Sequence, residues 1–102
     1  MNFLKQNPGN IIICLSATWC KPCQYIKDTV EYNFKKIQSD ENLCYKLDVD
    51  QYTDLYSFLK SRKMVNGVPT ILQYKQGNES FIPDNAVSGG DVNRVNNFFM
   101  NI

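Results

Sequence analysis

The sequence of 102 residues contains no histidine, and this absence excludes several kinds of chemistry. Without an imidazole, the chain has no Cys-His or Ser-His catalytic pair and no histidine ligand for a metal ion. Charge is nearly balanced, with 11 basic and 10 acidic residues, so a net charge of +1 gives no electrostatic basis for binding nucleic acid or a membrane surface. The longest apolar run, Ile11 to Leu15, is far too short to span a bilayer.

The first residues, Met1 to Lys5, lack the basic start, long apolar stretch and small-residue cleavage site of a secretory signal. We therefore expect a cytoplasmic protein in a reducing compartment, where structural disulfides are rare. Its four cysteines are then expected to be buried apolar residues or reactive groups. Chain length and a hydrophobic content of 43% predict one compact domain over residues 1–102.

Strand-like and helix-like segments alternate along the chain, which predicts an α/β domain. The helix that begins at Pro22 has apolar residues four, four and three positions apart, from Ile26 to Ile37, as on one face of an amphipathic helix. Residues 76–78 predict a hairpin turn before a strand that Pro83 ends. The expected elements are a short helix at 2–6, a buried strand at 11–15, a helix from 22 to about 39, a strand at 43–49, a helix capped by Thr53, strands at 70–74 and about 79–82, and a last helix opened by residues 88–91.

Cys20 and Cys23 are separated by two residues where a loop is expected to lead into a helix. Pro22 suits the first turn of that helix, because an N–H group has no helical partner there. Free backbone N–H groups and the helix dipole favour a thiolate at such a position and lower a cysteine pKa from ~8.5 to ~7 or below. Because the thiolate is the attacking species in disulfide exchange, we expect Cys20 to be the exposed nucleophile and Cys23 the buried resolving thiol. Lys21 adds a positive charge beside the pair, which favours the thiolate further.

Two other interpretations of the Cys-x-x-Cys spacing remain open on this evidence. It could be half of a zinc site, but a structural zinc site needs four ligands, and the only other cysteines, Cys14 and Cys44, are isolated in apolar strands. It could also be a chance spacing without chemistry. Cys14 and Cys44 themselves are expected to be small buried apolar residues on neighbouring strands.

The segment 16–23, Ser-Ala-Thr-Trp-Cys-Lys-Pro-Cys, resembles the active-site segment of thioredoxins. Segment 67–70, Gly-Val-Pro-Thr, resembles the cis-proline loop of that family, and segment 87–90, Val-Ser-Gly-Gly, is similar to its glycine turn before the last helix. Segment 46–50, Lys-Leu-Asp-Val-Asp, fits its second core strand. These matches follow the family order and cover nearly the whole chain from Ile11 onward.

The resemblance implies a three-layer α/β/α thioredoxin fold with a four-stranded mixed sheet. The segment before Ile11 is too short for the first strand and first helix of the family, so we expect the N-terminal, outermost strand to be missing. The resemblance also implies a thiol–disulfide oxidoreductase that reduces disulfides of partner proteins, with no cofactor and a separate thioredoxin-reductase-like electron donor; no metal is expected. Loss of the outermost strand would make the strand at 43–49 a sheet edge that could support a weak dimer, but Lys46 is the kind of residue that opposes such pairing, so we expect a monomer. Two alternatives are a thiol oxidase or isomerase in an intracellular disulfide-forming pathway, and a binding module without turnover.

The resemblance also assigns roles to particular residues. Cys20, Cys23 and Pro69 are implied to be catalytic, with a cis Val68–Pro69 bond lying against the disulfide. A flat substrate-binding surface is implied for Trp19, Lys21, Pro22, Val68 and Gly89.

The sequence departs from the family pattern at several positions. Lys21 replaces the usual Gly, and Asp28 stands where a Pro normally kinks the helix. Cys14 replaces a buried Asp that is thought to relay a proton to or from the resolving thiol, so we expect water to take over that relay. Lys46 occupies the position of a Lys that faces this Asp, and its ammonium is expected to reach solvent. A longer loop, residues 81–88, is expected near the site.

Overall fold

The computed structural model describes residues 9–102, so the helix expected at 2–6 lies outside the described residues. Four strands form one mixed sheet, in the spatial order β2-β1-β3-β4. The strands are β1 (Asn10–Ser16), β2 (Asn42–Asp48), β3 (Thr70–Tyr74) and β4 (Asn85–Ser88). Strand β2 runs parallel to β1, whereas β3 is antiparallel to both β1 and β4.

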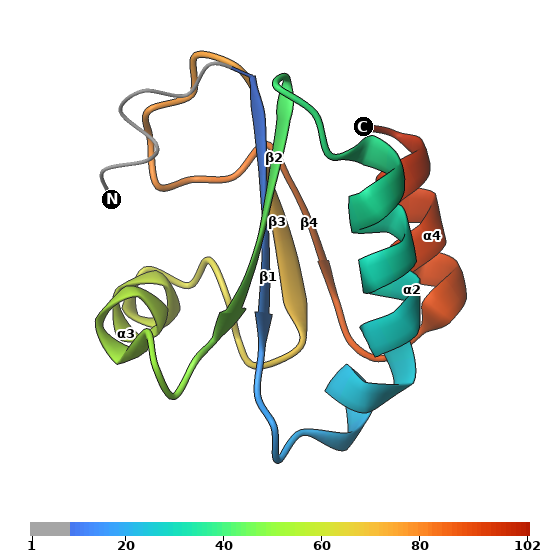
Figure 1. Cartoon of the computed structure of the whole chain (residues 1–102). Coiled ribbons are helices and arrows are strands. Elements are labelled where there is room, and N and C mark those ends of the chain that lie inside the picture. The colour runs from blue at the N-terminus through green and yellow to red at the C-terminus, as the bar shows by residue number, and fades with distance from the viewer. Residues whose placement is uncertain (1–8) are drawn as a thin grey trace.

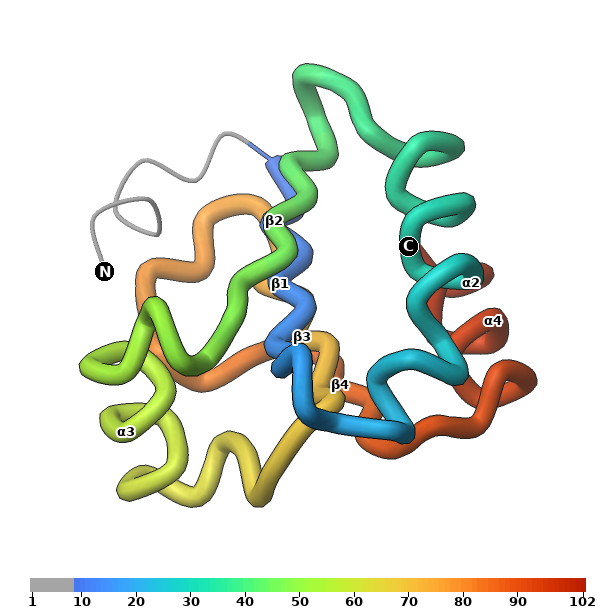
Figure 2. Tube along the Cα trace, turned by 60° about the horizontal axis from the view of Figure 1, so that its bottom comes forward, coloured from blue at the N-terminus to red at the C-terminus, as the bar shows by residue number. Residues whose placement is uncertain are grey.

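Helices cover both faces of the sheet, so the protein has the three layers that the family resemblance implies (Figure 1). One face is covered by α2 (Lys21–Ile37) and α4 (Val92–Met100), and the other by α3 (Thr53–Ser61). Figure 2 shows α2 and α4 side by side on their face of the sheet. They are joined by a hydrogen bond from Asn33 Nδ2 to Asn96 Oδ1 (3.1 Å) and by an edge-to-face contact of Phe34 with Phe99.

Strand β1 is the centre of the molecule, and its five apolar residues are buried, as their uninterrupted run predicts. Alternate residues serve opposite faces, because successive side chains of a strand point in opposite directions. Ile11, Ile13 and Leu15 pack in the core under α3, whereas Ile12 and Cys14 pack in the core under α2 and α4.

Strand β2 is at one edge of the sheet, and no described residue forms a strand beyond it. This agrees with the expected loss of the outermost strand. Cys44, on this edge strand, is half-buried against the core under α2 and α4, so the expectation of a buried Cys44 is wrong. The backbone N–H of Cys44 donates to Gln38 Oε1 at 3.0 Å, so a side chain takes the place of a neighbouring strand there.

The prediction of a strand at about 79–82 is wrong, because β4 begins only after Pro83. Side chain–backbone hydrogen bonds fold the predicted segment on itself: Ser80 N donates to Asn78 Oδ1 (2.8 Å), and Asn78 Nδ2 donates to the Ile82 carbonyl (3.0 Å). Asp84 then accepts a hydrogen bond from Lys75 N at 2.7 Å and turns the chain into β4.

The long loop between β3 and β4 lies at the opposite end of the sheet from the Cys-x-x-Cys segment, which corrects its expected position near the site (Figure 1). Its position follows from the antiparallel register, in which Thr70 pairs with Leu15 and Tyr74 with Ile11. The loop packs toward α3, because the Phe81 ring contacts Phe58 edge to face with centroids 5.3 Å apart.

Helix α3 begins one residue earlier than the sequence predicts. Tyr52 is its N-cap residue, and its carbonyl accepts the first helical hydrogen bond, from Tyr56 N (3.0 Å). Thr53 is therefore the first helical residue and not the cap. None of the helices described within residues 9–102 combines the length and apolar character needed to cross a membrane.

Candidate active site

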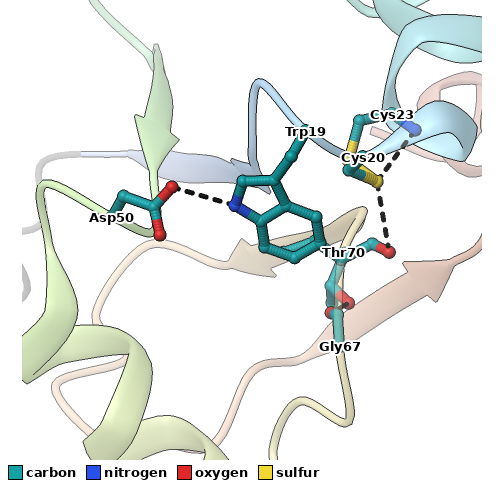
Figure 3. The surroundings of a disulfide bond; sticks show 7 residues. Trp19, Cys20, Cys23, Asp50, Gly67 and Thr70 are labelled. Atoms are coloured by element: carbon teal, nitrogen blue, oxygen red, sulfur yellow. Dashed lines mark hydrogen bonds between the residues drawn. A yellow bond between two sulfur atoms is a disulfide. The ribbon is translucent and has the colours of Figure 1, made fainter.

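The candidate site lies at the carboxyl end of β1, where three loops meet. Sγ of Cys20, in the loop after β1, lies 3.6 Å from the carbonyl oxygen of Val68, in the loop before β3 (Figure 3). The loop before α4 joins them, because Gly89 N donates to the Pro69 carbonyl at 3.1 Å. Gly90 packs so closely on Pro22 that an added Cβ would lie 3.0 Å from the Pro22 Cβ, which explains the glycine. Contacts between distant segments therefore bring together the residues that the sequence marks separately.

Cys20 and Cys23 are joined by a disulfide at the start of α2. Cys20 is the N-cap residue of α2, and its Sγ accepts a hydrogen bond from the backbone N–H of Cys23 at 3.2 Å. Pro22 lies in the first helical turn, as predicted. Once the disulfide is reduced, this N–H group and the helix dipole favour negative charge on the Cys20 sulfur.

Both cysteines of the disulfide are buried to the same extent, each with 5% of its surface exposed. Exposure therefore does not distinguish the two cysteines in the disulfide form, and an exposed Cys20 thiol with a buried Cys23 thiol in the reduced protein stays a prediction. The two sulfurs still have different surroundings: Cys20 faces the Val68 carbonyl, whereas Cys23 lines a cavity on the inner side of the disulfide.

Trp19 is the most prominent side chain beside the disulfide, with 66% of its surface exposed. Its indole Nε1 donates to Asp50 Oδ2 at 2.9 Å, which holds the ring across the face of the site (Figure 3). The sequence pattern places Asp50 only near a strand and does not reveal this contact. A signal was present, because Asp50 follows β2, and parallel strands such as β1 and β2 end at the same edge of a sheet.

The other residues expected to form the substrate-binding surface also lie around the disulfide. The Val68–Pro69 peptide bond is cis, Pro69 is buried, and Val68 is half-buried. The loop before them is held by Thr70 Oγ1, which donates to the Gly67 carbonyl at 2.7 Å (Figure 3). Lys21 and Pro22 are exposed on the first turn of α2. Gly89 has a φ of 96°, in the left-handed region where a residue without Cβ is favoured.

A cavity of about 250 Å³ lies behind the disulfide, between α2 and the sheet, and is lined by Cys23, Cys14, Lys46 and Asp48 among others. Burial raises the pKa of the Cys14 thiol to about 11, against the opposing effect of the Lys46 charge. The Lys46 side chain, 36% exposed, lies 3.5 Å from Glu31 Oε1 of α2. Its ammonium therefore avoids burial, as expected, but it does so beside a carboxylate of α2.

The part of the chain that the structure describes holds no group of three or more Cys, Asp or Glu side chains able to bind a metal ion. Cys14 and Cys44 are both free thiols. They lie on adjacent strands, with Cys44 opposite Ile12 and Cys14 opposite Lys46.

Comparison with known families agrees with this geometry. The family model described as thioredoxin matches residues 1–97. The chain belongs to the thioredoxin family. As a member of this family it has Asp28 within α2 where a Pro is usual, and α2 is one helix of 17 residues.

Several thioredoxins are similar to the chain. It is 36% identical to Thioredoxin-2 of Saccharomyces cerevisiae over 69 residues, which cover 68% of the chain and 61% of that relative. It is 38% identical to a thioredoxin of Coprinus comatus over 72 residues, covering 70% of the chain and 64% of the relative. These matches thus span less than two thirds of the relatives' lengths. Among solved structures, the thioredoxin of Fasciola hepatica superposes with a TM-score of 0.73 at 26% identity, covering 98% of the chain and 88% of that protein.

Proposed function

We propose that the protein is a thiol–disulfide oxidoreductase that reduces disulfides of other proteins through Cys20 and Cys23. The observation that carries this proposal is the disulfide at the start of α2, in which Cys20 is both the N-cap residue and the acceptor of the Cys23 N–H. A sulfur in that position is stabilised as a thiolate, which is the species that attacks a disulfide.

The reaction has two exchange steps. The Cys20 thiolate attacks one sulfur of the partner disulfide, forms a mixed disulfide and releases the other partner sulfur as a thiolate. Cys23 then loses its proton, attacks Cys20 Sγ and closes the intramolecular disulfide, releasing the second partner sulfur. The partner gains two electrons and two protons, and the dithiol of this protein loses them.

The surroundings of Cys20 support an extended protein segment as the substrate. The Val68 carbonyl lies 3.6 Å from the reactive sulfur, where its backbone can pair with such a segment. The exposed indole of Trp19, with Lys21, Pro22 and Gly89, provides a contact surface around it. An aromatic ring whose polar end is already bonded to Asp50 offers its apolar face to a partner.

Reduction is proposed as the direction of exchange, with electrons from a separate thioredoxin-reductase-like donor in a cytoplasmic, reducing compartment. We also propose a monomer, because Lys46 lies on β2, the edge strand of the sheet formed by residues 9–102, and is the kind of residue that opposes pairing with another strand. The reduction potential of the Cys20–Cys23 couple tests the direction. A value near about −270 mV supports a reductase, and a value of about −180 mV or above supports an oxidase or isomerase.

Insulin reduction by dithiothreitol tests the activity itself. The wild-type protein and a Cys44→Ser control should accelerate the reaction, whereas Cys20→Ser should not. No acceleration by the wild-type protein would contradict the proposal. Full biological activity of Cys20→Ser in cells would instead support a binding module without turnover. Partner proteins trapped as mixed disulfides by a Cys23→Ser variant would identify the substrates.

A further inference from the structure

The cavity behind the disulfide contacts only one of the two redox cysteines. Cys23 lines it, whereas Cys20 is absent from its described lining. Its volume of about 250 Å³ exceeds the roughly 30 Å³ that a water molecule occupies in the liquid, and charged side chains line part of it, so it can hold water. The resolving thiol therefore faces a partly polar cavity that Cys20 does not line.

A carboxylate reaches the same cavity from strand β2. Asp48 pairs with Ser16 in the β1–β2 register, just as Lys46 pairs with Cys14. These alternate residues share the face of the sheet under α2, and all of them line the cavity. Asp48 Oδ1 accepts a hydrogen bond from Asp50 N at 2.9 Å, which fixes the side chain without involving its second carboxylate oxygen.

We propose that Asp48 accepts the proton that Cys23 releases when its sulfur attacks the mixed disulfide, with water in the cavity carrying the proton. This inference rests on the proposed function. In this step the Cys23 S–H bond breaks, and a bond forms between Cys23 Sγ and Cys20 Sγ. The bond from Cys20 to the substrate sulfur breaks, the substrate leaves as a thiolate with that electron pair, and the proton passes through water to Asp48.

The other titratable groups that line the cavity are unsuited to this role at neutral pH. Lys27 of α2 and Lys46 of β2 are cations, and an ammonium group has no lone pair with which to accept a proton. Glu31 lies beyond Lys46 and is paired with it. Cys14 of β1 keeps its own proton, since burial raises its pKa to about 11.

In this chain the group that accepts the proton, Asp48, therefore lies on β2 and not on the central strand β1. The resemblance to thioredoxins assigns the proton relay to a carboxylate at position 14, on the central strand, where this chain has a cysteine. Asp48 lies on the neighbouring strand and on the same face, so it can serve the same cavity. This replaces the expectation that water alone carries out the relay.

The full-length reduced protein can be tested with 5,5′-dithiobis(2-nitrobenzoate) as the probe. The attack of Cys20 releases one thionitrobenzoate, and the attack of Cys23 on the resulting mixed disulfide releases a second, so the two steps are timed separately. All variants carry Cys44→Ser, so that this half-exposed thiol does not contribute. The variants to compare are Asp48→Asn, Asp48→Glu and, as a matched loss of one carboxylate outside the cavity, Asp28→Asn.

Asp48→Asn should slow the second release at least about tenfold near neutral pH and leave the first release unchanged, because a positioned base acts only on the Cys23 proton. The difference should shrink as pH rises and hydroxide takes the proton directly. Asp48→Glu should restore most of the rate, and Asp28→Asn should behave as wild type. An unchanged second release in Asp48→Asn, or a slowing that is equal at every pH, would overturn the assignment. If the wild-type protein itself gave no second release, the proposed function would fail, independently of Asp48.

Discussion

At the carboxyl end of β1, three loops bring Cys20, Val68 and Gly89 together, whereas at the opposite end of the sheet a single loop, residues 75–84, folds back on its own strand. The first end joins segments far apart in the chain through a few contacts and leaves Trp19 exposed. The second end is a local network of side chain–backbone hydrogen bonds. The reactive groups are thus concentrated at one end, and the two ends can be perturbed separately.

The end of the sheet opposite the disulfide, formed by residues 75–84 and called the far end below, is stabilised by two sets of hydrogen bonds. Tyr74, fully buried at the end of β3, donates through its hydroxyl to the Phe81 carbonyl at 2.8 Å, and burial raises its pKa to about 12. Asp84 accepts from Lys75 N and, at 2.9 Å, from Asn78 Nδ2. We therefore expect changes at this end to affect the free energy of unfolding, and changes at the site to affect catalysis.

The largest effect on insulin turnover is expected for Cys23→Ser in the active site. Without a resolving thiol the mixed disulfide at Cys20 cannot be released by the protein, so insulin turnover should fall at least about a hundredfold. Urea unfolding of the reduced variant should show a loss of no more than about 1–3 kcal/mol relative to reduced wild type, because a buried thiol is replaced by a hydroxyl group of similar size but greater polarity. Cys44→Ser is the control. A Cys23→Ser protein with wild-type turnover would show that Cys23 does not resolve the intermediate.

At the far end, Tyr74→Phe should lower the free energy of unfolding by about 1–2 kcal/mol, because it removes the hydroxyl donor and leaves the Phe81 carbonyl without this bond. Insulin turnover by the folded variant should remain that of wild type. Tyr32→Phe, on the exposed face of α2, provides the same chemical change without a stability effect. A clear loss of turnover in Tyr74→Phe would mean that the two ends are coupled.

Asp50→Ala should weaken substrate binding without unfolding the protein. Loss of the bond to Trp19 Nε1, worth about 1 kcal/mol, should raise KM for insulin roughly fivefold and leave kcat nearly unchanged. The chain contains one tryptophan, so intrinsic fluorescence reports on this indole alone. Asp40→Ala, at the other end of β2, should change neither KM nor emission. An unchanged KM in Asp50→Ala would show that the orientation of Trp19 does not matter for the substrate.

The smallest effect is expected for Asp84→Asn, and it should depend on pH. Hydrogen bonds from the Asn78 side chain and then from the Lys75 backbone lower the pKa of Asp84 in the folded protein. The ionised Asp84 carboxylate therefore stabilises the folded protein at pH values above its pKa in the unfolded chain. This stabilisation is lost as pH falls through the lower pKa that Asp84 has in the folded protein. The variant should be less stable than wild type by no more than about 1 kcal/mol near pH 7, because solvent screens the exposed carboxylate, and the difference should begin to shrink near about pH 4 and disappear only below the lowered pKa of Asp84 in the folded protein.

Thermal or urea unfolding over that pH range provides the measurement, with Glu79→Gln in the same loop as the control for a lost charge. A stability difference that stays constant into acid would show that the ionised form of Asp84 is not what stabilises the turn.

Two errors of the sequence-based predictions, the position of β4 and that of the loop before it, lie at the far end. Strand β3 was predicted with its observed bounds, and α2 to within two residues, because buried runs and helical periodicity leave clear patterns. Strand β4 was misplaced because only Val87 among its four residues is buried, so it has almost no apolar pattern. What decides its start is the set of hydrogen bonds made by Asn78 and Asp84, and side-chain bonds of this kind compete with strand pairing.

The sequence by itself determined the α/β class, the central strand, the Cys-x-x-Cys pair at a helix start and the segments 67–70 and 87–90, because each depends on local order along the chain. Only the tertiary structure decided that both cysteines of the disulfide are buried equally, that Asp50 holds Trp19 and that Asp48 shares a cavity with Cys23. Those features depend on which strand lies beside β1 and in what register. Residues about thirty positions apart become neighbours there, and nothing in their local sequence records the contact.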